Sequence, residues 1–292
     1  MIKTFNIPIP HRANTPATTL YVKIHTEKEA NLKTKPYIFM LPGGPGANHS
    51  HYKEYCCLTD VGNIAFYDPR GCGLSEKADQ SDYTMINYIE DLEVIRKHLS
   101  LSKIILLGKS YGAMCAIGYT LRYPEAVSKL VLAAGAANFK FMESAINHIK
   151  ANATDEQKRV FDLVQTGKIS SEEEINHYFS VMETYYSYKK RQGEKQTKPK
   201  PECPFAYEPL NRGFGDFLHT FDFENELYKI KSETLVLVGE EDWITAKEHS
   251  ELIAKKITGS KLHIFPRADH NLEFDVPDEF FGEIKKFIAP SK

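Results

Sequence analysis

The stretch KIILLGKSYG, residues 103–112, decides the fold. The apolar run at 104–107 predicts a buried strand, and residues 111–122 predict a helix that begins at once. Between them, GKSYG fits the pattern G-x-S-x-G, in which a serine stands on a sharp turn from strand to helix. Glycines two residues before and after Ser110 remove Cβ atoms that would collide in that turn. The serine hydroxyl would then be exposed at a helix N-terminus, which favours developing negative charge. The alternative is a serine that only caps a helix.

The same alternation of apolar runs and helical patterns extends to both sides of this stretch. Strands are expected at 19–24, 37–41, 63–67, 103–107, 130–134, 234–238 and 262–265, the first of them at an antiparallel edge. Helices are expected at 88–99, 111–122, 246–256 and 278–288. Strands that alternate with helices predict a mostly parallel central sheet flanked by helices.

The rhythm breaks between residues 137 and 226, where no strand run appears. Helical patterns are expected there at 142–149, 156–164 and 172–188. We therefore expect a core made of residues 1–136 and 227–292, with a helical cap inserted at 137–226. The basic stretch 189–204 is expected to be a solvated, mobile loop, although it could bind an anion. Its cations are Lys189, Lys190, Arg191, Lys195, Lys198 and Lys200.

Bulk composition excludes several classes of function. A net charge of −2 argues against a nucleic-acid partner, which a basic surplus would have to attract. No apolar run is long enough to span a membrane, and the first residues lack the pattern of a cleaved leader. The five cysteines are odd in number and form no CxxC pair, which favours free thiols and a cytoplasmic protein. Neighbouring Cys56 and Cys57 are expected in a buried helix rather than as a redox pair. Nothing in the sequence predicts an oligomeric state.

A serine nucleophile needs a base, and His270 follows the last expected strand, at the sheet edge where Ser110 would stand. Asp242 follows the preceding strand and would orient the imidazole. The chain order Ser, Asp, His is typical of this architecture. The competing carboxylates in these two loops are Glu240, Glu241 and Asp269.

The loop LPGGPG, residues 41–46, follows another buried strand and predicts an oxyanion hole. The N–H groups of Gly44 and Tyr111 are the expected donors. A phosphate-binding loop is the alternative, but the lysine of such a loop is missing. His49 and His51 could suggest a metal, yet no further ligands accompany them, so we expect loop histidines, no metal and no cofactor.

Together these motifs resemble the proline iminopeptidases, a family of serine peptidases. The resemblance is carried by the GGPG loop, by DPRGCGLS at 68–75, by the GKSYG turn and by the two late loops. It covers the sheet domain and matches the cap only loosely. It implies the α/β-hydrolase fold, with the DPRGCGLS turn in a structural role and Asp68 and Arg70 ionically tied nearby. The sequence departs from the family at Pro42, where a histidine is usual, and at Ala113, where a glycine is usual.

The resemblance predicts an aminopeptidase that forms an acyl-enzyme on Ser110 and releases an N-terminal residue, preferably proline, from short peptides. Gly43 and Trp243 are expected to contact the substrate; in the family a glutamate often stands at the second position. The cap carboxylates expected to bind the substrate's ammonium group are Glu143, Glu174, Glu183 and Glu208. One alternative is a carboxylesterase or amidase for small acyl substrates, which an aromatic cap would suit. The other is a non-catalytic ligand-binding protein on a hydrolase scaffold.

Overall fold

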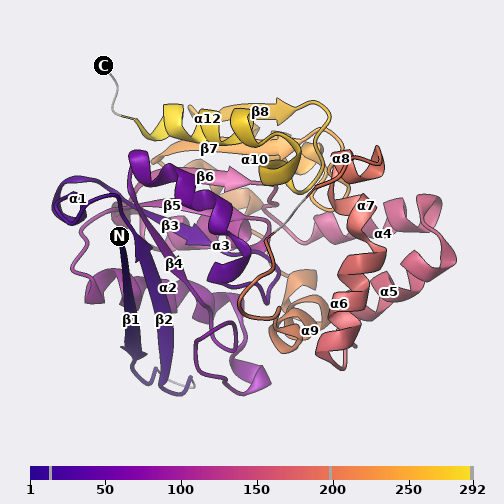
Figure 1. Cartoon of the computed structure of the whole chain (residues 1–292), viewed down its shortest axis with the longest axis horizontal. Coiled ribbons are helices and arrows are strands. Elements are labelled where there is room, and N and C mark those ends of the chain that lie inside the picture. Colours follow the sequence, from indigo (N-terminus) through magenta and orange to yellow (C-terminus); the bar gives the residue numbers. More distant parts are fainter. Residues whose placement is uncertain (13–14, 197–198, 290–292) are drawn as a thin grey trace.

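The structure, a computed structural model, describes residues 1–12, 15–196 and 199–289 (Figure 1). In this part of the chain eight strands form one sheet, in the order β1-β2-β4-β3-β5-β6-β7-β8. The strands are β1 (Ile2–Ile9), β2 (Thr18–His25), β3 (Tyr37–Leu41), β4 (Asn63–Tyr67), β5 (Ile104–Lys109), β6 (Val127–Ala133), β7 (Glu233–Gly239) and β8 (Lys261–Phe265). From β4 to β8 all neighbours are parallel, while β1, β2 and β4 pair antiparallel. The expected mostly parallel sheet is confirmed.

Burial explains which strands can be predicted clearly from the sequence. Strands β4 and β5 are buried at every residue, and β3 and β7 are buried at all but the first, so they read as continuous apolar runs. Strand β2 alternates between buried and half-buried residues because only one of its faces packs against the core. The strand expected at 19–24 at an antiparallel edge does pair antiparallel, but it is not the outermost strand, since β1 pairs along the whole of β2 and takes the edge.

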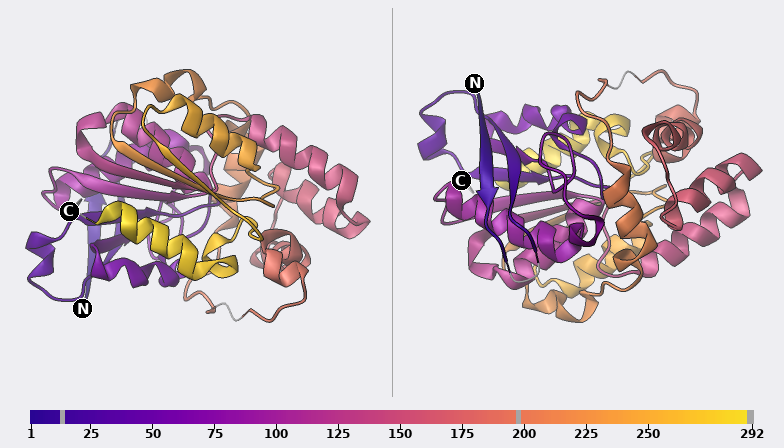
Figure 2. Two further views of the ribbon diagram at one scale, coloured as in Figure 1. Left: turned by 90° about the horizontal axis from the view of Figure 1, so that it is seen from above. Right: turned by 90° about the horizontal axis from the view of Figure 1, so that it is seen from below.

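Helices cover both faces of the sheet (Figure 2). On one face α2 (Met85–His98), α3 (Tyr111–Arg122) and α10 (Lys247–Lys256) enclose the larger apolar cluster. On the other face the 3-10 helix η2 (Lys53–Asp60) packs with α12 (Pro277–Ile288). Cys56 and Cys57 lie in η2, where Cys56 is half-buried and Cys57 is exposed, so the expected buried helix is wrong for this pair. No helix within the described ranges combines the length and apolarity needed to cross a bilayer.

Between β6 and β7 the chain builds a separate group of helices beside the carboxyl ends of the strands (Figure 1). These cap helices are α4 (Lys140–Asn152), α5 (Asp155–Gln165), α6 (Glu172–Val181), α7 (Glu183–Tyr186), α8 (Tyr188–Arg191) and α9 (Tyr207–Gly215). They enclose an apolar cluster of their own, which also takes in Trp243 from the loop after β7. Short 3-10 helices at 217–219 and 224–229 then return to the main core, where Leu218 and Leu227 are buried.

Two expectations for the cap region need correction. The single helix expected at 172–188 is interrupted after Val181 and again after Tyr186, and becomes α6, α7 and α8. The basic stretch is not a solvated loop throughout, because its first three cations form the last turn of α8. Two of them are ion-paired, Lys190 with Glu183 and Arg191 with Asp269. Lys198 lies outside the described residues.

Candidate active site

Ser110 occupies the junction of β5 and α3 with φ 56° and ψ −122°, a left-handed conformation that an ordinary side chain rarely adopts. The flanking glycines make the turn possible. A Cβ on Gly108 would lie 2.4 Å from the carbonyl oxygen of Gly112, and one on Gly112 would lie 2.1 Å from that of Leu41. The backbone N–H of Ser110 donates to Ala133 in β6 at 2.9 Å, which fixes the turn to the sheet. This is the geometry that G-x-S-x-G predicts.

Asp242 and His270 meet at the same edge of the sheet. The Nδ1 atom of His270 lies 2.8 Å from Oδ2 of Asp242, and both side chains are buried. The carboxylate also accepts the backbone N–H groups of Ile244 and Thr245, at 2.9 and 3.0 Å, and the Thr245 hydroxyl at 3.0 Å. Burial alone would raise the pKa of Asp242, but His270 and these donors outweigh it and hold the pKa below its ordinary value.

The competing carboxylates of the two loops have other partners. Asp269 accepts the N–H of His270 at 2.8 Å and pairs with Arg191 at 2.7 Å. Burial, reinforced by the charge of Asp242, raises the pKa of Asp269 to about 8. The exposed carboxylates of Glu240 and Glu241 lie near surface cations. Asp242 is therefore the carboxylate of these loops that meets the imidazole ring.

The glycine loop after β3 faces the serine. The N–H of Gly43 donates to the Tyr52 hydroxyl at 2.8 Å, so the next N–H of the loop, that of Gly44, is the expected oxyanion donor. Gly44 has φ 109°, which suits glycine, and a Cβ there would lie 3.0 Å from the Phe205 ring. Tyr111 is the first residue of α3, where backbone N–H groups have no partner within the helix. Gly43, Gly44 and Ser110 line one cavity.

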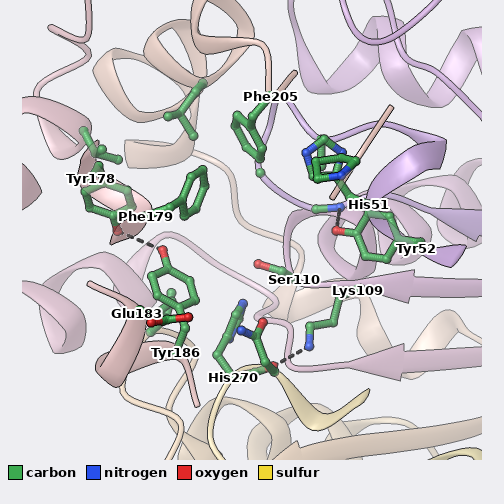
Figure 3. Close-up of a pocket in the computed structure, with 18 of the residues that line it drawn as sticks. His51, Tyr52, Lys109, Ser110, Tyr178, Phe179, Glu183, Tyr186, Phe205 and His270 are labelled. Carbon is green, nitrogen blue, oxygen red and sulfur yellow. Dashed lines mark hydrogen bonds between the residues drawn. The ribbon is translucent and has the colours of Figure 1, made fainter. Parts of the chain in front are cut away.

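This cavity has a volume of about 730 Å³ and lies between the cap and the sheet edge (Figure 3). Ser110 and His270 both line it. Because Nδ1 of His270 contacts Asp242, the other imidazole nitrogen, Nε2, is left for the serine. Its apolar walls are Phe141, Met142, Ala145, Ile146, Phe161, Val164, Tyr178, Phe179, Tyr186, Phe205, Leu210, Phe214, Trp243 and Ile244. Trp243 donates its Nε1–H to the carbonyl of Tyr185 at 2.7 Å, so the ring presents an apolar surface to the cavity.

Of the four cap carboxylates expected to bind an ammonium group, Glu183 lines this cavity. Glu208 is not among the lining residues and pairs with Lys77 at 3.3 Å. Glu174 accepts the N–H and the hydroxyl of Ser170, and Glu143 is exposed on the first turn of α4. The cavity also has four acidic lining residues that the sequence did not single out: Glu54, Glu172, Glu202 and Glu273.

The DPRGCGLS turn and the two histidines belong to the scaffold around the glycine loop. Arg70 forms an ion pair with Asp91 at 2.6 Å, and Asp68 Oδ2 lies 2.9 Å from Nδ1 of His49, within hydrogen-bond distance. All of these groups are buried. His51 lines the cavity and His49 does not. Within the described ranges, no group of three or more His, Cys, Asp or Glu side chains is placed to hold a metal ion.

Sequence reasoning missed a buried ion pair in the site, between Lys109 and Glu273 at 2.9 Å. One signal was available. Lys109 ends an otherwise apolar strand immediately before the serine, and a charge in a buried strand needs a partner.

Comparison with known proteins agrees with this geometry. The family described as alpha/beta hydrolase fold matches residues 36–277. A proline iminopeptidase of Saccharolobus solfataricus is 30% identical over 284 residues, which cover 92% of this chain and 88% of that protein. A proline iminopeptidase of Lactobacillus helveticus is 28% identical over 272 residues and covers 87% and 90% of the two chains. The crystal structure of proline iminopeptidase from Mycobacterium smegmatis aligns with a TM-score of 0.73 at 19% identity, over 98% of this chain and 97% of that one.

Proposed function

Because this chain belongs to the α/β-hydrolase fold family, we propose that it is a serine aminopeptidase that releases the first residue, preferably proline, of short peptides. The observation that carries this proposal is the His270–Asp242 hydrogen bond at 2.8 Å, with His270 and the strained Ser110 on one cavity wall. The similarity to proteins named proline iminopeptidase, over 87–92% of this chain, supports the choice of substrate.

In the proposed reaction, Ser110 Oγ attacks the carbonyl carbon of the first residue while His270 Nε2 takes the hydroxyl proton. Asp242 stabilises the imidazolium that forms. The N–H groups of Gly44 and Tyr111 would hold the oxyanion. His270 then returns the proton to the leaving amine, the acyl-enzyme remains on Ser110, and a water molecule activated by His270 releases the product.

Recognition of a free N-terminus requires a carboxylate, since an unpaired ammonium in a partly dry pocket is costly. Glu183 is our candidate because it lines the cavity near Tyr186 and His270 (Figure 3). It pairs with Lys190 at 2.9 Å in the free enzyme. A substrate ammonium would compete with that lysine for the carboxylate.

The test compares prolyl-arylamide with its N-acetylated analogue. We expect kcat/KM to be higher for the free amine by about a hundredfold or more, because the blocked substrate loses a charge-assisted contact. Glu183→Gln should reduce that ratio. Glu208→Gln is the matched control, since it removes a cap carboxylate that faces Lys77 instead of the cavity. Equal rates on both substrates would reject the aminopeptidase proposal.

A carboxylesterase or amidase for small acyl substrates is the second candidate. It is favoured by the largely apolar cavity walls and by Trp243, an aromatic lining residue at a position where the proline iminopeptidases often have a glutamate. If blocked substrates and short acyl esters are cleaved faster than free-amine arylamides, this second candidate replaces the first, with Ser110, Asp242 and His270 in unchanged roles.

A further inference from the structure

Lys109 is the last residue of β5 and stands directly before the proposed nucleophile. Its side chain carries a charge but is only 3% exposed, and the rest of the strand is apolar. A buried ammonium group is tolerated only where charges and hydrogen bonds compensate for the lost water. The environment of Lys109 should therefore reveal what the charge is doing there.

Both partners of the ammonium group belong to the segment that carries His270, which is the loop after β8 and the short helix that follows it. The Nζ atom donates to the backbone carbonyl of His270 (dashed line in Figure 3) and pairs with Glu273, three residues further along, at 2.9 Å. The Glu273 side chain is 6% exposed and lies in α11 (Leu272–Asp275). The contact thus joins the strand before the nucleophile to the loop of the base, across 161 and 164 positions of the chain.

His270 is consequently held at three points. Its N–H donates to Asp269 at 2.8 Å, its ring Nδ1 meets Asp242 at 2.8 Å, and its carbonyl accepts from Lys109. We propose that the Lys109–Glu273 pair is a positioning device that fixes the main chain of His270 relative to Ser110. The proposal rests on the role of His270 as the base in the proposed function.

The pairing also explains why a cation can stand so close to the base. During the reaction His270 becomes positively charged, and a lone neighbouring cation would oppose that change. Glu273 balances the charge of Lys109, so that the backbone contact adds no net charge beside the imidazolium. Removing either partner alone leaves an unbalanced charge, and the two single variants should affect the imidazolium in opposite directions.

Other titratable and charged groups surround the base from every packed element. Asp242 faces it from the loop after β7, Asp269 with Arg191 from its own loop and α8, and Tyr186 from α7. The remaining ones line the same cavity: His51, Tyr52, Glu54, Glu172, Tyr178, Glu183, Lys200 and Glu202. All of them are identical in the variants compared, so a difference between variants reports the Lys109–Glu273 pair.

The experiment compares wild type, Lys109→Met, Glu273→Gln and the double variant on whichever arylamide or aryl ester the wild type cleaves. We expect Lys109→Met to lower kcat by about 10- to 100-fold with KM changed less than about threefold, because the base is displaced while the apolar walls of the cavity stay. The acid limb of the pH profile of kcat/KM should move to higher pH in Lys109→Met and to lower pH in Glu273→Gln, each by on the order of one pH unit. In the double variant the limb should return towards wild type while kcat stays low.

Lys129→Met is the matched control, since Lys129 donates to the Phe287 carbonyl and lies 3.7 Å from Glu233 in β7, away from the cavity. It should leave kcat and the acid limb unchanged. Limbs that move in the same direction in both single variants, or wild-type kcat in Lys109→Met, would overturn the proposal. If Lys109→Met does not fold, the acid limb of Glu273→Gln decides alone. An acid limb in that variant that does not move to lower pH overturns the proposal. Because an ester serves as well as an arylamide, failure of the aminopeptidase assignment leaves this test intact.

Discussion

Replacing Gly112 with alanine sets local helix propensity against the packing of the candidate active site. Gly112 is the second residue of α3, and alanine is favoured over glycine inside a helix by about 1 kcal/mol. From the sequence alone, Gly112→Ala should therefore stabilise the protein. The surroundings of this glycine predict the opposite.

An alanine Cβ at position 112 would lie 2.1 Å from the carbonyl oxygen and 2.6 Å from the carbonyl carbon of Leu41, and 2.8 Å from the Pro42 oxygen. Ordinary contacts are about 3.5–4.0 Å, so α3 and the glycine loop would have to separate by roughly 1.5 Å. The contacted atoms are backbone, and Leu41 is held in the sheet opposite Gly108 of β5. Overpacking of this kind costs about 3 kcal/mol or more. After the helix gain, we expect a net loss of about 2 kcal/mol or more in the free energy of unfolding.

Urea denaturation followed through the single tryptophan, Trp243, measures this loss. The matched control is Gly282→Ala at an exposed position of α12, where a Cβ would meet nothing within 4 Å and should stabilise by about 0.5–1 kcal/mol. We also expect Gly112→Ala to lower kcat by about a hundredfold or more, because a shift of about 1 Å or more misplaces the proposed oxyanion donors. A Gly112→Ala protein as stable and as active as wild type would refute this reasoning.

Three further predictions concern the site and its loops. Ser110→Ala and His270→Ala should each lower kcat by about 10⁴-fold or more in a folded protein, and combining them should cost little more, as stopped assays on the cleaved substrate would show. Burial and the Asp242 charge raise the pKa of Asp269 from 3.8 to about 8, so the folded protein keeps a proton that the unfolded chain releases in this interval. Stability contributed by Asp269 therefore falls as the pH rises from about 4 to 8. The stability of Asp269→Asn relative to wild type, measured by urea midpoints, should therefore be greater at pH 8 than at pH 5. A difference between the two proteins that is the same at both pH values would contradict this. Asp275→Ala should destabilise by about 3 kcal/mol or more, because its buried carboxylate accepts N–H groups at the start of α8 and in the loop of His270. Denaturation measures it, and a loss under about 1 kcal/mol would show that these contacts are dispensable.

The sequence predicted the parts of the fold in which local pattern and packing agree. The helix expected at 111–122 coincides with α3, because the sharp turn at Ser110 fixes where the helix starts. Strand β1 was missed, since Pro8 interrupts its pattern, and an edge strand can tolerate that proline. Helix α9 was missed for a similar reason: Pro209, Gly213 and Gly215 weaken its helical signal, and tertiary packing supplies the stability.

The candidate site divides in the same way. Ser110, Asp242 and His270 could be named because each follows a recognisable strand, and parallel strands bring their carboxyl ends to one edge. The role of Lys109 could not be derived, since its partners lie more than 160 residues away. The break between α7 and α8 depends on a distant contact too: the Ser187 hydroxyl donates to the buried carboxylate of Asp275 at 2.5 Å.

The central claim is that Ser110 is the nucleophile of a hydrolase, and covalent trapping tests it most directly. The wild-type protein would be treated with a fluorophosphonate and digested, and the modified peptide identified by mass spectrometry. We predict one adduct, on the peptide that contains Ser110, with much slower labelling in His270→Ala and none at that position in Ser110→Ala. A protein that stays unlabelled at Ser110 while folded, or is labelled there equally fast without His270, would contradict the account.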